Sequence, residues 1–249
     1  MSLFYHQWDT TLIDKIYLEP AFVLHSRPYQ ETSLIIDFFT KSYGRLNAIA
    51  KGAKRPKSPL RSVLTPACKL VVSMTGKSEL KNLSSVEIVD HFNLRDGISL
   101  NSIIYINELI SKATEKEDPH ENIFLEYEIL LRNLNDSKGS EQLEKSLRNF
   151  ELNLLQEMGY GIDLTREAES NMKIDSDTRY RFDPDKGFSS INENDSTQIS
   201  FLGQDVLDFS QGQFEKKTTR DASKIIMRLA LDYHLGNKTL NIRKYLTKN

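Results

Sequence analysis

Lysine and arginine residues cluster between Lys41 and Lys81, where their side chains could bind phosphate groups. This 41-residue stretch carries ten Lys or Arg residues and one acid, Glu79, so its formal charge is +9. The whole chain of 249 residues has a net charge of −2, which leaves −11 for the remainder. Such a concentration of like charge indicates a polyanionic partner, because phosphate groups neutralise the mutual repulsion of the Lys and Arg side chains. A solvated basic loop would show the same charge pattern.

The centre of this segment contains five candidates for phosphate contact. They are Lys51, Lys54, Arg55, Lys57 and Arg61. Pro56 and Pro59 restrict the backbone between them and favour an extended loop whose charges face solvent. Arg27 and Arg45, which lie beside expected strands, are two further candidates.

Known catalytic and metal-binding patterns are absent from the sequence. It contains no Walker loop and no GxGxxG, HExxH, GxSxG or CxxC motif. The single cysteine, Cys68, cannot form an internal disulfide or supply a cysteine-rich zinc site. No two of the five histidines have the spacing of a metal pair. We therefore expect binding rather than catalysis, with no catalytic residue, no metal and no cofactor.

Residues 21–90 predict a small β-barrel that would hold the basic segment. Short β-branched or aromatic runs occur at residues 21–25, 33–39, 46–50, 70–74 and 86–89. A long basic loop precedes the fourth run. Five strands at this spacing suit an OB-type barrel, whose loops flank its nucleic-acid face. A small sandwich or an SH3-like barrel would give much the same pattern.

Helices are expected in the rest of the chain. From Ser99 the apolar period changes from 2 to 3.6, and three helical faces follow, around residues 103–110, 123–134 and 143–158. Residues 161–200 are polar and irregular, with a short hairpin expected over residues 180–188. Apolar spacing around residues 225–235 predicts a final helix. The fold class expected is therefore α+β.

The composition is that of a polar globular protein. Hydrophobic residues make up 39% of the chain and charged residues 27%, as in soluble domains. No apolar run approaches the roughly 18–20 residues of a membrane span. The N-terminal residues lack the basic start and apolar run of a signal peptide. We therefore expect a cytoplasmic protein with no membrane partner.

Several short motifs follow one another in a specific order. They are Ala21-Phe22-Val23-Leu24-His25-Ser26-Arg27-Pro28, Ala50-Lys51-Gly52-Ala53-Lys54, Tyr105-Ile106-Asn107-Glu108-Leu109, Leu147-Arg148-Asn149-Phe150-Glu151-Leu152 and Met158-Gly159-Tyr160-Gly161. In this combination the chain closely resembles the RecO family of bacterial recombination mediators and DNA repair proteins. The resemblance runs from about Ala21 to Arg243 and depends on the order and spacing of the motifs together.

The resemblance implies a division of the chain into parts. Residues 21–92 would form the OB-fold and residues 93–160 a helical domain. Residues 161–200 would form a small irregular, zinc-ribbon-like insert that lacks cysteines. Residues 201–249 would add C-terminal helices that complete the helical domain, and residues 1–20 would be an N-terminal extension.

The resemblance also implies an activity and its partners. The family binds single- and double-stranded DNA, anneals complementary strands and needs no nucleotide cofactor for annealing. It forms a complex with RecR and contacts the C-terminal tail of the single-stranded DNA-binding protein SSB. These interactions help RecA, an indirect partner, to load onto SSB-coated DNA. The resemblance thus implies a bacterial cytoplasmic protein that is nucleoid-associated during repair.

Arg148 is the candidate for contact with the SSB tail. On a helix, Leu147, Phe150 and Leu154 would face the core and Arg148 would point away, as a solvated arginine does. The resemblance implies more, because the matching family helix helps to bind the acidic, phenylalanine-ended tail. A planar guanidinium beside an apolar groove can hold a terminal carboxylate through two hydrogen bonds.

The sequence departs from the family pattern in two places. Many members place four cysteines in the insert, whereas Gly161 to Phe188 contains none, so a bound metal is not expected here. Met1 to Glu19 carries apolar residues spaced roughly as in an amphipathic helix. A packed extension is expected in preference to the alternative, a partner-binding arm, since isolated apolar helices are unstable unless they dock.

Two other classes of function remain open. An enzyme acting on nucleic acid could use an OB-fold as its anchor, and it would convert its substrate and need magnesium or a small molecule. An RNA-binding protein would share the charge pattern but prefer RNA.

Overall fold

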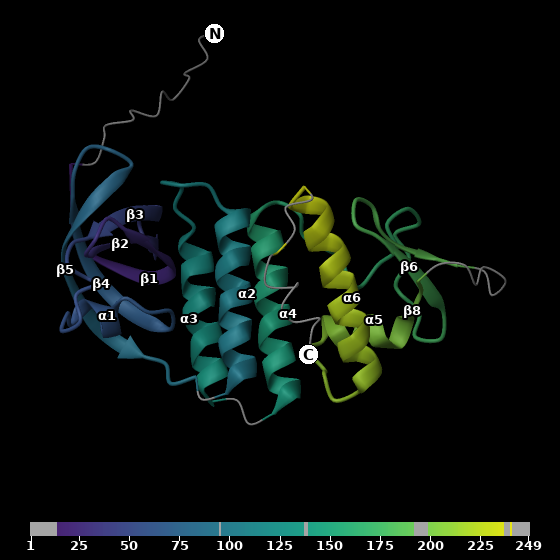
Figure 1. Ribbon diagram of the computed structural model, residues 1–249. Helices are drawn as coiled ribbons and strands as arrows, with labels where there is room; N and C mark the ends of the chain where they lie inside the picture. The colour runs from purple at the N-terminus through teal and green to yellow at the C-terminus, as the bar shows by residue number, and fades with distance from the viewer. Residues whose placement is uncertain (1–13, 95, 137–138, 192–198, 237–239, 241–249) are drawn as a thin grey trace, which may run out of the picture. The chain divides into compact units, whose positions relative to one another are not determined.

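Strands come first and helices follow, so the α+β class is confirmed. The computed structural model describes residues 14–94, 96–136, 139–191, 199–236 and 240 (Figure 1). The chain divides into two compact units, Met1–His91 and Phe92–Asn249. The finer division expected at residues 160 and 200 stays a prediction.

The first unit is a closed five-stranded barrel. Its strands are β1 (Lys15–Tyr29), β2 (Ser33–Thr40), β3 (Gly44–Ala50), β4 (Cys68–Thr75) and β5 (Leu80–His91). They are arranged in the order β1-β2-β3-β5-β4, with β3 and β5 parallel and the other neighbours antiparallel. A short helix, α1 (Leu60–Val63), lies in the connection between β3 and β4. The five expected strands are thus present, in an order that agrees with an OB-type barrel.

Alternation of side chains along the strands explains the barrel interior. In β3, Leu46, Ala48 and Ala50 are buried, while the residues between them are partly exposed. Leu70, Val72 and Met74 of β4 belong to the same core, and each is fully buried. A period of two places one face of each strand inside the barrel and the other toward solvent.

The barrel begins earlier than the sequence indicated. β1 starts at Lys15 rather than at Ala21, and Ile16 is fully buried in the barrel core opposite Met74. The helix expected from Met1 to Glu19 is therefore wrong for residues 15–19, and residues 1–13 lie outside the described residues. A bulge between Ile16 and Glu19 breaks the strand period, which is why the alternation was hidden.

The second unit opens with three helices. They are α2 (Gly97–Ala113), α3 (Glu121–Asp136) and α4 (Ser140–Glu157), which correspond to the three expected helical faces. α3 packs on α4, and α2 also contacts α4 (Figure 1). The hydroxyl of Tyr127 on α3 donates to Asn107 Oδ1 on α2 at 2.6 Å, and both side chains are buried. This bond satisfies two polar groups that burial would otherwise make costly.

A small sheet follows the third helix. It consists of β6 (Arg179–Asp183), β7 (Gly187–Ser190) and β8 (Phe201–Leu202) in the order β7-β6-β8. β6 and β7 form the hairpin expected from the sequence. Asp183 Oδ1 accepts hydrogen bonds from the backbone N–H groups of Asp185 and Lys186, which closes the turn.

Two further helices complete the second unit. They are α5 (Gly203–Ser210) and α6 (Lys217–His234), and α6 packs against both α5 and α4. One face of α6 is buried through Ala222, Ile226, Ala230 and other residues at helical spacing. In the part of the chain that the structure describes, no helix is long and apolar enough to cross a membrane.

Candidate nucleic-acid interface

The basic segment after β3 is an ordered loop. Backbone hydrogen bonds join Lys54 N to Thr32 O at 2.9 Å, Arg55 N to Gly52 O at 3.1 Å and Ser58 N to Arg55 O at 3.0 Å. Ala53 is fully buried within the barrel core and anchors the loop. These contacts hold the loop beside the turn between β1 and β2.

The five loop cations predicted to contact phosphate are all exposed. They are Lys51, Lys54, Arg55, Lys57 and Arg61. Within the described residues, none of them forms an ion pair with a carboxylate. Lys54 Nζ donates to the backbone oxygen of Gln30 at 3.1 Å and keeps its charge. Cations without a carboxylate partner remain available to phosphate. We call the segment that carries these five cations, residues 51–61, the basic loop.

The two strand arginines differ from the basic loop and from each other. Arg27 is exposed on β1. Arg45 instead donates to Asp37 Oδ2 at 3.2 Å, and its side chain is only 12% exposed. This pair joins β3 to β2 and compensates the charge of Arg45. Phosphate contact by either arginine stays a prediction.

The structure corrects the expected orientation of Arg148. Its side chain is only 10% exposed, and Nη2 donates to Glu151 Oε1 at 2.8 Å. The same carboxylate oxygen accepts the hydroxyl of Tyr105 on α2 at 2.8 Å. Arg148 therefore does not point away into solvent as the helical pattern suggested. The buried carboxylate one turn later supplies the counter-charge that permits its burial.

Arg148 lines a pocket of about 430 Å³ in the second unit. Its walls come from α2, α4 and α6 and include Ile98, Asn101, Ser102, Tyr105, Leu143, Glu144, Leu147, Arg148, Glu151, Lys224 and Arg228. Arg148 Nε is buried and has no hydrogen-bond partner among the described residues. Three cations, Arg148, Lys224 and Arg228, line it together with two acids, Glu144 and Glu151, which leaves a formal charge of +1. An apolar wall beside a net positive charge suits a ligand that joins an apolar side chain to a carboxylate. We call this hollow the Arg148 pocket.

Sequence reasoning missed Lys224 and Arg228. Both are exposed residues of α6 that line the Arg148 pocket. They lie four positions apart, as solvated charges on a helix commonly do, so their spacing carries no signal of a site. Only the packing of α6 on α4 brings them to Arg148.

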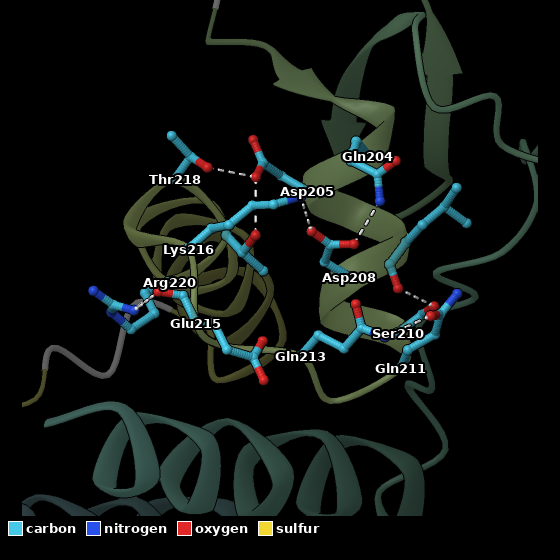
Figure 2. A network of polar contacts seen from close by, with 12 residues as sticks. Gln204, Asp205, Asp208, Ser210, Gln211, Gln213, Glu215, Lys216, Thr218 and Arg220 are labelled. Atoms are coloured by element: carbon cyan, nitrogen blue, oxygen red, sulfur yellow. Dashed lines mark hydrogen bonds and ion pairs between the residues drawn. The ribbon is translucent and has the colours of Figure 1, made fainter. Parts of the chain in front are cut away.

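A polar network between α5 and α6 fixes the start of α6 (Figure 2). Lys216 Nζ donates to Asp208 Oδ2 at 2.8 Å, and Gln204 donates to the other oxygen. Asp205 Oδ1 accepts the hydroxyls of Thr218 at 2.7 Å and Thr219 at 2.9 Å. These side chains take part in holding the helix that carries Lys224 and Arg228.

Asp208 is a buried carboxylate whose ionised form is stabilised by this network. Burial alone would raise its pKa, but hydrogen bonds from Lys216 and Gln204, the positive charge of Lys216 and a hydrogen bond from Thr219 together hold the pKa below its usual value. In return, Asp208 raises the pKa of Lys216. The pair is therefore charged at neutral pH.

The described residues of the second unit offer no set of side chains for a zinc ion. Among the described residues, no group of three or more His, Cys, Asp or Glu side chains could hold a metal. The sheet β7-β6-β8 and its flanking loops contain buried apolar residues instead, namely Leu164, Ile174, Tyr180, Phe182, Phe188 and Phe201. The rings of Phe182 and Phe188 lie 4.9 Å apart.

Comparison with known proteins covers both units. Residues 15–92 match the family described as Recombination protein O N terminal, and residues 94–243 match Recombination protein O C terminal. The chain belongs to the RecO family. The match to the second family description alone spans more than half of the chain, so membership does not depend on one motif.

Individual RecO proteins are similar over nearly the full chain. DNA repair protein RecO of Polynucleobacter asymbioticus is 42% identical over 233 residues, which cover 92% of this chain and 94% of the relative. The protein of the same name from Nitrosospira multiformis is 40% identical over 92% of this chain and 93% of the relative. DNA repair protein RecO of Haemophilus influenzae strain PittGG is 39% identical over 93% of this chain and 96% of the relative. These RecO relatives support a role in DNA repair and recombination.

Proposed function

We propose that this chain is a DNA-binding recombination mediator. It anneals complementary single strands and, with RecR, helps to load RecA onto SSB-coated DNA. The observation that carries the proposal is the basic loop: five exposed cations, without carboxylate partners among the described residues, on the barrel of a RecO-family chain. The activity needs no catalytic residue, because binding and bringing strands together suffices for annealing.

The basic loop is the proposed contact with single- and double-stranded DNA. Backbone phosphates are recognised by Lys and Arg regardless of sequence, and the release of counterions makes such binding sensitive to salt. Loops beside an OB-type barrel track a nucleic-acid backbone in this way. Arg27 extends the same contact as a further candidate.

The Arg148 pocket is the proposed site for the SSB tail. The tail brings acids, a terminal phenylalanine and its carboxylate. Leu143, Leu147 and Ile98 offer apolar surface to the ring, while Lys224 and Arg228 attract the acids. In this arrangement Arg148 contributes from the pocket wall, where its Nε is unsatisfied.

Residues 161–200 are proposed to form a zinc-ribbon-like insert. In this chain the insert would be stabilised by apolar packing instead of by a bound metal. The six buried side chains of this sheet and its flanking loops support the idea, since burial of apolar side chains can hold a small sheet together without a metal. RecR remains the proposed partner in RecA loading.

The test of DNA contact is a triple charge reversal in the basic loop. Lys54→Glu, Arg55→Glu and Lys57→Glu together are expected to weaken binding to an oligonucleotide by about tenfold or more near physiological salt, and to flatten the salt dependence. Fluorescence anisotropy measures both quantities. Reversal of Lys116, Lys145 and Lys173, exposed cations of the second unit, is the matched control. Unchanged affinity and salt slope in a folded loop variant would refute the contact.

The test of the Arg148 pocket uses its exposed cations, whose removal leaves the core intact. Arg228→Ala is expected to weaken binding of a synthetic SSB-tail peptide by about 1–2 kcal/mol. Lys217→Ala is the control, because Lys217 is an exposed cation of the same helix that does not line the pocket. Calorimetry that finds equal affinity for wild type and Arg228→Ala places the tail elsewhere.

A further inference from the structure

A second hollow of about 730 Å³ lies in the second unit and shares no lining residue with the Arg148 pocket. It is formed where α4 ends, where α6 ends and where the β6–β7 hairpin turns. Its lining includes Tyr160, Asp163, Glu167, Asp185, Tyr233 and His234. Nothing in the proposed annealing activity uses this groove.

Aromatic rings held in fixed positions line one side of the groove. The rings of Tyr160 and His234 stack with centroids 4.2 Å apart and an interplanar angle of 15°. The ring of Tyr233 meets that of His234 edge to face at 5.0 Å. Both tyrosines nevertheless remain open, since Tyr160 is 43% exposed and Tyr233 is 54% exposed. Exposed rings that are already positioned can stack on a ligand with little loss of entropy.

The backbone explains why these rings do not move freely. Gly159, at φ +84°, follows the C-terminal cap of α4, and Tyr160 N donates to Leu155 O at 2.8 Å. His234 Nε2 lies 3.0 Å from the backbone oxygen of Pro184 in the hairpin. The aromatic wall is thus tied to α4, α6 and the hairpin at once.

Aromatic faces bind both nucleobases and cations, and the charge of the groove distinguishes between these two kinds of ligand. Three carboxylates line the groove, from Asp163, Glu167 and Asp185, against the two cations Arg166 and Lys186. Arg166 Nη1 donates to Asn171 O at 2.8 Å and keeps its charge, so three carboxylates against two cations leave the lining with a formal charge of −1. The negative charge of Asp185, with a smaller effect of Asp183, raises the pKa of Tyr233. A nucleobase would bring phosphates toward these carboxylates, whereas a cation would be attracted.

We propose that this aromatic–acidic groove binds an arginine side chain from a basic segment of a partner protein. A planar guanidinium can stack on the open face of Tyr160 or Tyr233 while its N–H groups pair with a carboxylate such as Asp185. Lysine would satisfy the charge but not the planar stacking. The groove is thus an interaction surface in addition to the proposed DNA and peptide contacts.

The test uses the full-length chain with ¹³C-labelled tyrosine and a blocked peptide, Gly-Arg-Gly-Arg-Gly. Tyr160→Phe and Tyr233→Phe assign the two ring signals in NMR spectra. The peptide is expected to shift both signals saturably, whereas a citrulline peptide, which is neutral and nearly isosteric, leaves them in place. Asp185→Asn is expected to raise the Kd by about threefold or more. Glu169→Gln, an equal charge change at an exposed acid outside the lining, leaves it unchanged.

Three results would overturn the proposal. The first is the absence of ring shifts at millimolar arginine peptide, and the second is an equal response to the citrulline peptide. The third is a larger shift of the same rings by an oligothymidylate, which would make the groove a nucleic-acid site. None of these results bears on the basic loop, whose test measures DNA affinity in different variants.

Discussion

Arg148 and Glu151 form a buried pair of charges in the wall of the Arg148 pocket. Both side chains are nearly inaccessible, and Glu151 Oε1 accepts hydrogen bonds from Arg148 and from Tyr105. Removal of one partner leaves the other charge buried, which costs far more than the pair itself contributes. Arg148 is therefore a structural residue of the second unit as well as part of the Arg148 pocket.

Arg148→Ala is expected to lower the free energy of unfolding by about 3 kcal/mol, because it strands the buried carboxylate. The double variant Arg148→Met with Glu151→Leu is expected to recover most of that loss. Urea denaturation measures both. Asn149→Ala, at the exposed neighbouring position, serves as a control and should change stability by less than about 0.5 kcal/mol. A single variant as stable as wild type would mean that the pair is not buried as described.

Asp208 predicts a specific dependence of stability on pH. Its pKa is lowered in the folded chain, so its contribution is fully present above the usual carboxyl pKa of about 4 and disappears as pH falls through the folded pKa. Asp208→Asn should therefore be less stable than wild type at neutral pH, and its stability should fall less steeply below about pH 4. Thermal melts across this range measure the difference. Parallel profiles for the two proteins would contradict the assignment.

Single residues were predicted with uneven success. The exposure of the five cations followed from their charge. The extended backbone expected from Pro56 and Pro59 was wrong, because this segment is a series of turns that leads into α1, with Pro59 in a helical conformation. The burial of Arg148 did not, because it depends on Glu151 and on Tyr105 from another helix. Lys224 and Arg228 gave no signal in the sequence, since only the packing of α6 on α4 joins them to the pocket.

The helices and strands were easier to predict from the sequence than the contacts of single residues. Five strands and three successive helices follow directly from apolar periods of two and 3.6. The start of β1 was misplaced because the bulge at Tyr17 and Leu18 interrupts the strand period. α1 was missed because four residues are too few to show a helical pattern.

The small sheet β7-β6-β8 carries a prediction of its own. Phe188 is fully buried and its ring contacts that of Phe182 at a tilt of 43°, so apolar packing rather than a metal should hold this sheet. Phe188→Ala is expected to cost about 3–5 kcal/mol of stability. A chelator should leave the melting temperature of wild type unchanged, and elemental analysis should find no stoichiometric zinc. One equivalent of zinc in the purified protein would overturn this account.

The two proposed sites lie in different units of the molecule. The basic loop belongs to the barrel unit, and the Arg148 pocket belongs to the helical unit. Substitutions in one should therefore leave the other intact, and the two functions should separate. DNA contact is needed in every annealing reaction, whereas contact with the SSB tail matters only when SSB covers the strands.

Strand annealing on naked and on SSB-coated oligonucleotides tests the central claim most directly. Without ATP or metal, wild type is expected to anneal both substrates. The variant with Lys54→Glu, Arg55→Glu and Lys57→Glu should lose at least about tenfold in rate on both, because binding to phosphates is impaired. Arg228→Ala should be slow only on SSB-coated strands. If the basic-loop variant annealed naked strands as fast as wild type does, DNA contact through the barrel would be contradicted.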